Sequence, residues 1–168
     1  EAVQLPWGII LLFGGGMALA KAFETTGLAS WLGVQMTAFE GWPFFVALIL
    51  LIGAVNFLTE ITSNLATTAM LLPVLAPLAL EIGVHPFGLM VGAAVAASCA
   101  FMLPVATPPN AVVFGAGYLR IPDMVSRGLA LNLISICIIA IAVYLLLPLL
   151  WEIDLQQFPD QFRGASKN

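Results

Sequence analysis

The sequence predicts an all-α protein whose helices cross a membrane several times, and both composition and charge spacing support this fold class. Hydrophobic residues make up 61% of the 168 residues and charged residues 8%, whereas an average soluble domain is about 45–50% apolar and about 25% charged. The mean hydropathy is +1.06. Residues 2–20, 61–80, 82–119 and 128–151 contain no Asp, Glu, Lys or Arg, and charge-free apolar stretches of about 20 residues are typical of transmembrane helices.

The charge balance and the cysteines exclude several other classes of protein. The net charge is −4 with five Lys and Arg residues, so no basic surface can follow a nucleic acid backbone. Cys99 and Cys137 lie in apolar stretches and form neither a metal-binding nor a redox motif. The chain starts at Glu1 without an initiator Met or a signal peptide pattern. We therefore expect a piece of a longer membrane protein.

We predict a membrane domain at residues 1–151, followed by a polar tail at residues 152–168. Residues 5–23 are apolar and long enough to span the bilayer as a helix. Gly14, Gly15 and Gly16 in this span are expected to allow close helix approach or a helix break. Residues 24–41 mix polar and apolar side chains, which favours a helix lying in the membrane interface.

Residues 42–80 form a long apolar tract with a polar centre from Thr59 to Asn64. The apolar pieces on either side are about 15 residues each, which reach about 22 Å as helices and are short for a full crossing. The tract therefore predicts a re-entrant hairpin with a polar tip.

The next tract, residues 87–118, is interrupted from Pro104 to Asn110 by three prolines. Prolines remove backbone donors and interrupt a helix, so we expect a broken helix with an unwound centre. Residues 128–150 are predicted as the final span. The preceding loop, 119–127, contains Arg120 and Arg127 and is expected on the cytoplasmic side.

The two polar gaps are the candidate sites of function. Irregular backbone at membrane depth is tolerated where it lines a cavity, as in the discontinuous helices of secondary transporters. A helix beginning at Ser63 and Asn64 presents its positive end to an anion. Carbonyl groups near Thr107 and Pro108 suit a hard cation such as sodium, and the Thr107 hydroxyl suits a carboxylate.

Structural explanations compete with each of these interpretations. The pattern around Ser63 also fits simple helix packing, and the prolines near Thr107 also fit a kink. Glu60 is either a functional acid or a partner for hairpin backbone, because buried membrane carboxylates serve both purposes. His85 is expected to be an ordinary loop residue. An intramembrane hydrolase using Ser63 and His85 is disfavoured, because no oxyanion motif accompanies them.

At these two gaps the sequence resembles the divalent anion:sodium symporter family, the sodium-coupled dicarboxylate transporters. Residues 59–67 (TEITSNLAT) resemble that family's second Ser-Asn-Thr hairpin, and residues 102–118 (MLPVATPPNAVVFGAGY) resemble the signature in its last broken helix. Leu65 stands where the family usually has Thr, so a hydroxyl donor to the substrate is absent at this position.

The resemblance implies a non-enzymatic elevator-type transporter built from inverted repeats, with this chain in the second repeat. It implies sodium as coupling ion without another cofactor, a small dicarboxylate such as succinate, malate or fumarate, a lipid bilayer, a homodimer, and a bacterial plasma membrane location. Substrate-facing positions carried over from the family are Ser63, Asn64, Leu65, Thr107 and Pro108. Positions carried over to the sodium site are Thr59, Thr62, Asn64 and Ala106.

Two alternatives remain beside sodium-coupled symport. One is a sodium-independent anion exchanger, or a sulfate or citrate carrier of the same fold. The other is a non-transporting subunit of a membrane complex. Proton-conducting subunits of that kind need acidic or basic residues in several spans, and here only Glu60 lies deep in an apolar tract.

Overall fold

The computed structural model describes residues 7–28, 31, 34 and 43–163. Every regular element in this part is a helix, and no strand occurs in it, so the predicted all-α class is confirmed for the described residues. The interfacial helix expected at 24–41 lies mostly outside them. The helices are α1 (Trp7–Thr25), α3 (Phe44–Leu58), α4 (Asn64–Glu81), α5 (Pro86–Ala96), α6 (Pro108–Gly115), α7 (Ile121–Trp151) and α8 (Asp160–Arg163).

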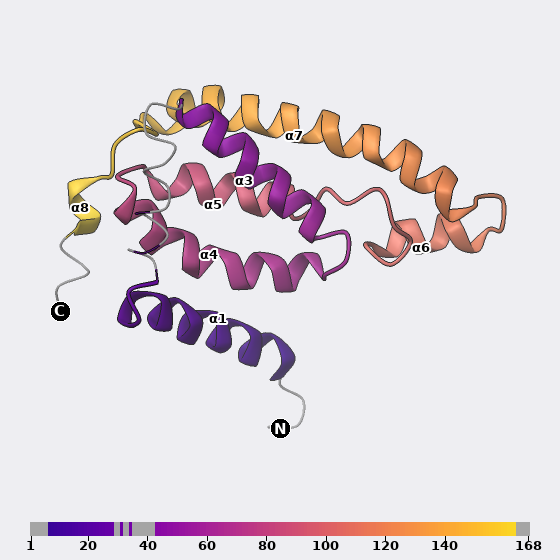
Figure 1. Cartoon of the computed structure of the whole chain (residues 1–168), viewed down its shortest axis with the longest axis horizontal. Coiled ribbons are helices and arrows are strands. Elements are labelled where there is room, and N and C mark those ends of the chain that lie inside the picture. Colours follow the sequence, from indigo (N-terminus) through magenta and orange to yellow (C-terminus); the bar gives the residue numbers. More distant parts are fainter. Residues whose placement is uncertain (1–6, 29–30, 32–33, 35–42, 164–168) are drawn as a thin grey trace.

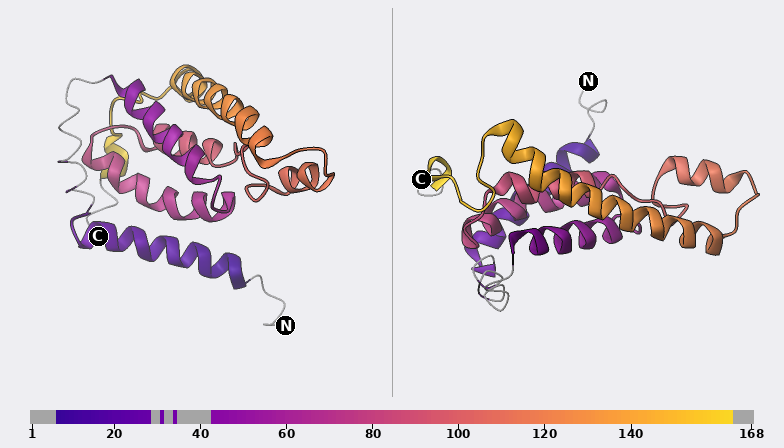
Figure 2. Two further views of the ribbon diagram at one scale, coloured as in Figure 1. Left: turned by 45° about the vertical axis from the view of Figure 1, so that its right-hand side comes forward. Right: turned by 90° about the horizontal axis from the view of Figure 1, so that it is seen from above.

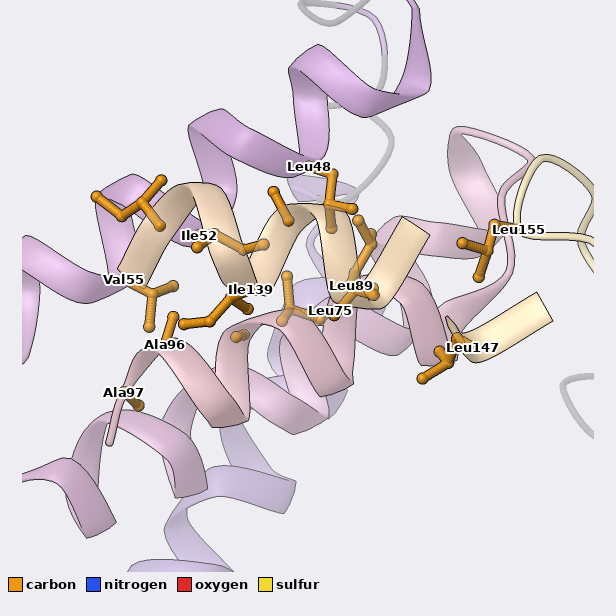
Figure 3. Close-up of a cluster of buried hydrophobic side chains, with 14 of the residues drawn as sticks. Leu48, Ile52, Val55, Leu75, Leu89, Ala96, Ala97, Ile139, Leu147 and Leu155 are labelled. Atoms are coloured by element: carbon orange, nitrogen blue, oxygen red, sulfur yellow. The ribbon is translucent and has the colours of Figure 1, made fainter. Parts of the chain in front are cut away.

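Helix α5 packs against three other helices, α3, α4 and α7 (Figure 1). A methyl group added at Gly92 of α5 would lie 3.3 Å from side-chain atoms of both Ile52 and Leu48 of α3. Small residues let helix backbones approach closely, which matters in a bilayer because burying apolar surface there gives little net driving force. Figure 3 shows the resulting core. Its buried members include Leu48, Ile52, Val55, Leu75, Leu89, Ala96, Ala97, Ile139, Leu147 and Leu155.

Helix α1 lies alongside α4, as both Figure 1 and Figure 2 show. A methyl group at Gly16 of α1 would lie 2.6 Å from the carbonyl oxygen of Ala69 in α4. That carbonyl lacks its usual helix donor because Pro73, four residues on, has no N–H. Gly14 and Gly15 face open space. The predicted close approach therefore occurs at Gly16, and the helix continues through all three glycines.

By length and composition, α4 and α7 are long and apolar enough to cross a membrane. Helix α4 has 18 residues, three more than the predicted apolar piece, because Asn64, Leu65 and Glu81 are already helical. Helix α3 has 15 residues, as expected, and the residues that join it to α4 form the tip, defined here as residues 59–63.

The predicted final span, 128–150, lies within a longer helix, because α7 begins at Ile121. The segment 119–127 was expected to be a loop on account of its charges. Its Asp123 carboxylate instead accepts hydrogen bonds from the backbone N–H of Arg120 at 3.3 Å and from its Nε at 3.1 Å. An acid in the first turn and a proline beside it are helix-start signals.

The predicted bounds of the broken helix also need correction. Helix α5 ends at Ala96, and α6 begins at Pro108, so the irregular segment, here named the break, covers residues 97–107. Pro108, Pro109 and Asn110 were expected in the unwound part but form the first turn of α6. Proline is tolerated there because the first N–H groups of a helix have no partner within it.

The C-terminal segment folds back onto the loop between α4 and α5. The backbone N–H of His85 donates to the carbonyl of Leu155 at 3.0 Å, and Leu155 and Phe158 are buried. Glu152 ends α7 in a left-handed conformation with φ of 53°. The predicted tail is therefore polar in composition but attached through its apolar residues.

Candidate functional site

The tip is built from hydroxyl and amide side chains that bond to one another. The Oγ1 of Thr59 lies 2.7 Å from Asn64 Oδ1 and 2.8 Å from the carbonyl of Ala97, and its single hydrogen serves one of them at a time. Thr62 donates to the carbonyl of Leu58 at 2.9 Å, and its Oγ1 lies 2.5 Å from that of Thr67. These contacts fix the turn between α3 and α4.

Ser63 is the residue that precedes the first turn of α4. It has an extended conformation, with ψ of 132°, and its side chain makes no capping hydrogen bond. A helix leaves its first N–H groups without partners within it, and the helix dipole adds partial positive charge at that end. An exposed, uncapped helix start is suited to bind an anion.

Three backbone N–H groups of the break are bound by one carboxylate, that of Glu60. Glu60 Oε1 accepts from the N–H of Phe101 at 2.7 Å and of Met102 at 2.9 Å, and Oε2 accepts from Leu103 at 3.0 Å. Asn132 of α7 donates to Oε1 at 2.8 Å. Glu60 is only 3% exposed and bonds to the backbone of the break. One interpretation of the sequence had expected it to bond to the hairpin's own backbone.

The carbonyl side of the break is held by other side chains. Asn56 Nδ2 donates to the carbonyl of Cys99 at 2.5 Å. Asn110 Nδ2 donates to the carbonyls of both Ala100 and Leu103 at 3.0 Å. Because buried backbone groups are costly without partners, these donors explain how a segment with few helical hydrogen bonds of its own is stable here. The polar network is defined as Asn56, Thr59, Glu60, Asn110 and Asn132.

The start of α6 differs from that of α4 in what it offers a ligand. Its first two residues, Pro108 and Pro109, have no N–H, and the N–H of Asn110 is already bonded to Thr107 Oγ1 at 3.4 Å. The start of α6 therefore offers no free amide group to a ligand. What remains for a ligand is the hydrogen of the Thr107 hydroxyl, together with the dipole of a short helix.

The tip and the break meet at an open cavity of about 460 Å³. Its lining contains no Lys, Arg or His, so an anion in it relies on amide and hydroxyl groups, helix dipoles or a bound cation. The lining residues are Ile61, Thr62, Ser63, Asn64, Leu65, Val105, Ala106 and Pro108.

The cavity brings together most of the positions singled out from the sequence. Six of them line it, and their side chains come from segments more than 40 residues apart. Thr59 is not among the lining residues and lies fully buried, linked through Asn64. Thr107 is also not in the lining, although both of its neighbours are.

Sequence reasoning assigned no role to Asn56, Asn110 or Asn132. Asn56 and Asn132 are fully buried, and the Oδ1 atom of each has no hydrogen-bond partner. The sequence did show that each is an amide within an apolar stretch. Because polar residues within membrane segments face the protein interior and have partners, burial of these amides could have been predicted. What the sequence did not contain was the identity of those partners.

Residues 2–153 match the family described as the sodium:sulfate symporter transmembrane region. This chain belongs to that family. The resemblance found from the two motifs is thereby confirmed, and the chain is part of a membrane transporter family.

Relatives within this family have been named for their transport activity. A sodium-dependent dicarboxylate transporter SdcS of Staphylococcus saprophyticus subsp. saprophyticus is 53% identical over 156 residues, which cover 93% of this chain and 30% of the relative. A protein of the same name from Staphylococcus aureus is 51% identical over the same share of each chain. The chain thus spans about a third of the length of the curated relatives it matches.

Proposed function

We propose that this chain forms part of a secondary transporter, not an enzyme, that couples sodium entry to the symport of a dicarboxylate or a related divalent anion. The observation that carries the proposal is the cavity shared by the tip and the break, in a chain whose relatives are named sodium-dependent dicarboxylate transporters. Succinate, malate and fumarate are the proposed substrates.

The proposed sodium site uses oxygen atoms of the tip, the start of α4 and the break. Its residues are Thr59, Thr62, Asn64 and Ala106, which contribute hydroxyl, amide or backbone carbonyl oxygens. Such neutral oxygen ligands suit a hard monovalent cation. Support comes from the 2.7 Å separation of Thr59 Oγ1 and Asn64 Oδ1, which already places two oxygens together.

The proposed substrate site lies beside it. Its residues are Ser63, Asn64, Leu65, Thr107 and Pro108. Ser63 and the start of α4 supply donors and positive potential for one carboxylate. Leu65, with 51% of its surface exposed, supplies an apolar contact instead of a donor. Sodium bound next to the anion offsets the anion's charge. The binding site therefore moves across the membrane when it holds both sodium and substrate or when it is empty, and not when it holds only one of them.

The architecture proposed for the whole transporter is an elevator built from inverted repeats, present as a homodimer in a bacterial plasma membrane. In this architecture residues 42–80 form a re-entrant hairpin, 87–118 a broken helix that contains the break, and 128–150 the final span within α7. The support from this chain is the sequence of short and interrupted apolar helices, a pattern that accompanies midplane binding sites in transporters.

The test is uptake of labelled succinate into liposomes that contain the longest reading frame including this chain. We expect uptake in sodium buffer, little in choline buffer, and a loss of at least about tenfold in Ser63→Ala and Asn64→Ala, which each remove a polar group from the site. Ser98→Ala is the matched control, because Ser98 is exposed and outside the cavity lining. Uptake indifferent to both sodium and Asn64 would contradict the proposal.

A second candidate substrate is sulfate, which the description of the matching family favours. Competition by sulfate in the same liposomes separates the two substrates. A further variant is Leu65→Thr, which places a hydroxyl in the first turn of α4. Uptake of succinate that depends on Asn64 and on internal dicarboxylate, but not on sodium, would favour an anion exchanger instead.

A further inference from the structure

Glu60 is a buried acid that the proposed binding sites do not use. Its two oxygens accept four hydrogen bonds, three from the backbone of the break and one from Asn132 of α7. All four partners are N–H donors, the set that a carboxylate accepts. Through these four hydrogen bonds one side chain of the tip is connected both to the break and to α7.

A short series of contacts leads from Glu60 to the proposed sodium site. Glu60 Oε2 holds the N–H of Leu103, and the carbonyl of Leu103 accepts from the N–H of Ala106 at 3.2 Å. The same carbonyl accepts from Asn110 Nδ2, while the Asn110 N–H bonds to Thr107 Oγ1. The position of Glu60 therefore sets where the backbone of Ala106 and the hydroxyl of Thr107 lie.

Helix α7 closes the other side of the break. A methyl group at Gly128 would lie 2.6 Å from the Cα of Met102 and would also contact the Phe101 carbonyl. One turn further along the same helix, Asn132 bonds to Glu60. The backbone at residues 101–103 is thus held between the carboxylate on its amide side and the backbone of α7, a packed arrangement that leaves it little freedom.

We propose that Glu60 is a positioning residue, which fixes the break so that the Ala106 carbonyl of the proposed sodium site is in place before the ion binds. The inference rests on the proposed function. Glu60 acts through Leu103 and Ala106 and not as a ligand, because all four of its hydrogen bonds are to protein groups and it does not line the cavity. Preorganised ligands bind more tightly, since less ordering is required on binding.

The first test measures the break without any transport. Cys99 lies in the break and is partly exposed, so its labelling by N-ethylmaleimide, followed on the Cys99 peptide by mass spectrometry, reports how often the break opens. In the full-length protein we expect Glu60→Gln to raise the labelling rate about tenfold or more. The NH₂ group of the glutamine would replace an oxygen that accepts from an N–H group, so that hydrogen bond would be lost. The matched control is Glu152→Gln, at an exposed acid remote from the break, and it should leave the rate unchanged.

The second test measures sodium in the same variants. We expect Glu60→Gln to raise the half-saturating sodium concentration for succinate uptake about tenfold, with the maximal rate per folded carrier changed by no more than about twofold. A residue with only a structural role would lower the amount of folded carrier and leave the sodium requirement unchanged. A raised half-saturating sodium concentration with a nearly unchanged maximal rate therefore identifies a positioning residue.

Each combination of results decides the question. Faster Cys99 labelling together with a raised sodium requirement supports the proposal. Unchanged labelling, or faster labelling with an unchanged sodium requirement, overturns it. If Glu60→Gln does not fold, Asn132→Leu takes its place, since it removes one donor to Glu60. For this variant we expect smaller increases in both the Cys99 labelling rate and the sodium requirement. If neither increases, the proposal is wrong. If the wild type takes up no succinate with sodium, the proposed function fails, whereas unchanged Cys99 labelling alone would still refute the role of Glu60.

Discussion

The two ends of the helical body hold irregular backbone in opposite ways. At one end the break is held by the polar network, through a carboxylate, a hydroxyl and three amides. At the other end, where Figure 1 places α8, the loop and tail are held by an aromatic cluster. This cluster is defined as His85, Phe87, Trp151, Phe158 and Phe162, with ring centroids 5.0 to 6.5 Å apart.

The difference follows from what surrounds each end. Several residues of the break are buried, among them Ala97, Ala100 and Ala106, and a buried amide or carbonyl group needs a partner. The loop between α4 and α5 connects two helix ends, and three rings of the aromatic cluster, Phe87, Trp151 and Phe162, are partly exposed, so apolar packing is enough to attach the tail. We therefore expect substitutions at the polar end to affect folding and transport, and substitutions at the aromatic end to affect local stability alone.

The largest effect is expected for Glu60→Ala. The change leaves three backbone N–H groups and the Asn132 amide without their acceptor, and a buried donor left unsatisfied costs about 1–3 kcal/mol. We expect little or no folded protein after detergent extraction, measured as the monodisperse fraction and its melting temperature. Normal yield and melting temperature would show that the polar network does not hold the break.

Gly128→Ala is expected to have the next largest effect. The added methyl group would overlap the backbone of Met102, and overpacking of this kind costs about 1–3 kcal/mol. The measurement is the melting temperature of the detergent-solubilised protein. Gly53→Ala is the matched control, because its methyl group would make an ordinary contact of 3.8 Å with Ile136 and alanine favours a helix by about 1 kcal/mol over glycine. Equal loss in both variants would contradict close packing at the break.

Phe162→Ala should have a smaller and more local effect. The ring contacts His85, Phe87 and Phe158 at the aromatic end, and aromatic pairs are worth about 0.5–1.5 kcal/mol. We expect faster amide hydrogen exchange at residues 152–163 with unchanged uptake. Tyr118→Ala, at a ring that is 92% exposed, is the control. A change in sodium-dependent uptake would break the distinction between the two ends.

The smallest effect concerns pH at the aromatic end. Burial lowers the pKa of His85, in the loop between α4 and α5, and the nearby charge of Asp154 raises it in part. Its Nδ1 accepts from the Phe87 N–H at 3.2 Å, which a protonated ring cannot do. The unfolded chain therefore binds the proton more readily, so stability is present above the ordinary histidine pKa of about 6.5 and declines as pH falls below it.

Hydrogen exchange of the tail, compared between about pH 8 and about pH 5.5 after correction for intrinsic rates, measures this decline. His85→Asn should remove it, because asparagine also caps a helix and does not titrate. A decline of the same size in His85→Asn would assign the pH dependence to another group.

The sequence predicted the local features of this molecule better than its long-range contacts. The charge-free stretches identified the helices, and the prolines and glycines identified an interrupted segment near residues 104–110. The start of the break at Ala97 could not be predicted, because the carbonyls of Ala97 and Cys99 accept from Thr59 and Asn56, which lie 38 and 43 residues away from them in the chain. Asn56 was visible as an amide in an apolar helix, but its partner, the carbonyl of Cys99, was not.

The sequence by itself determined the membrane class, the helical character, the family and the two polar gaps, since composition and short motifs specify these locally. The tertiary structure decided that Ser63 and Asn64 share a cavity with Ala106 and Pro108, that α6 starts without free amides, and that one carboxylate holds the break. Hydrogen bonds act over about 3 Å in space, and residues far apart in the chain come within that distance only after the helices have packed.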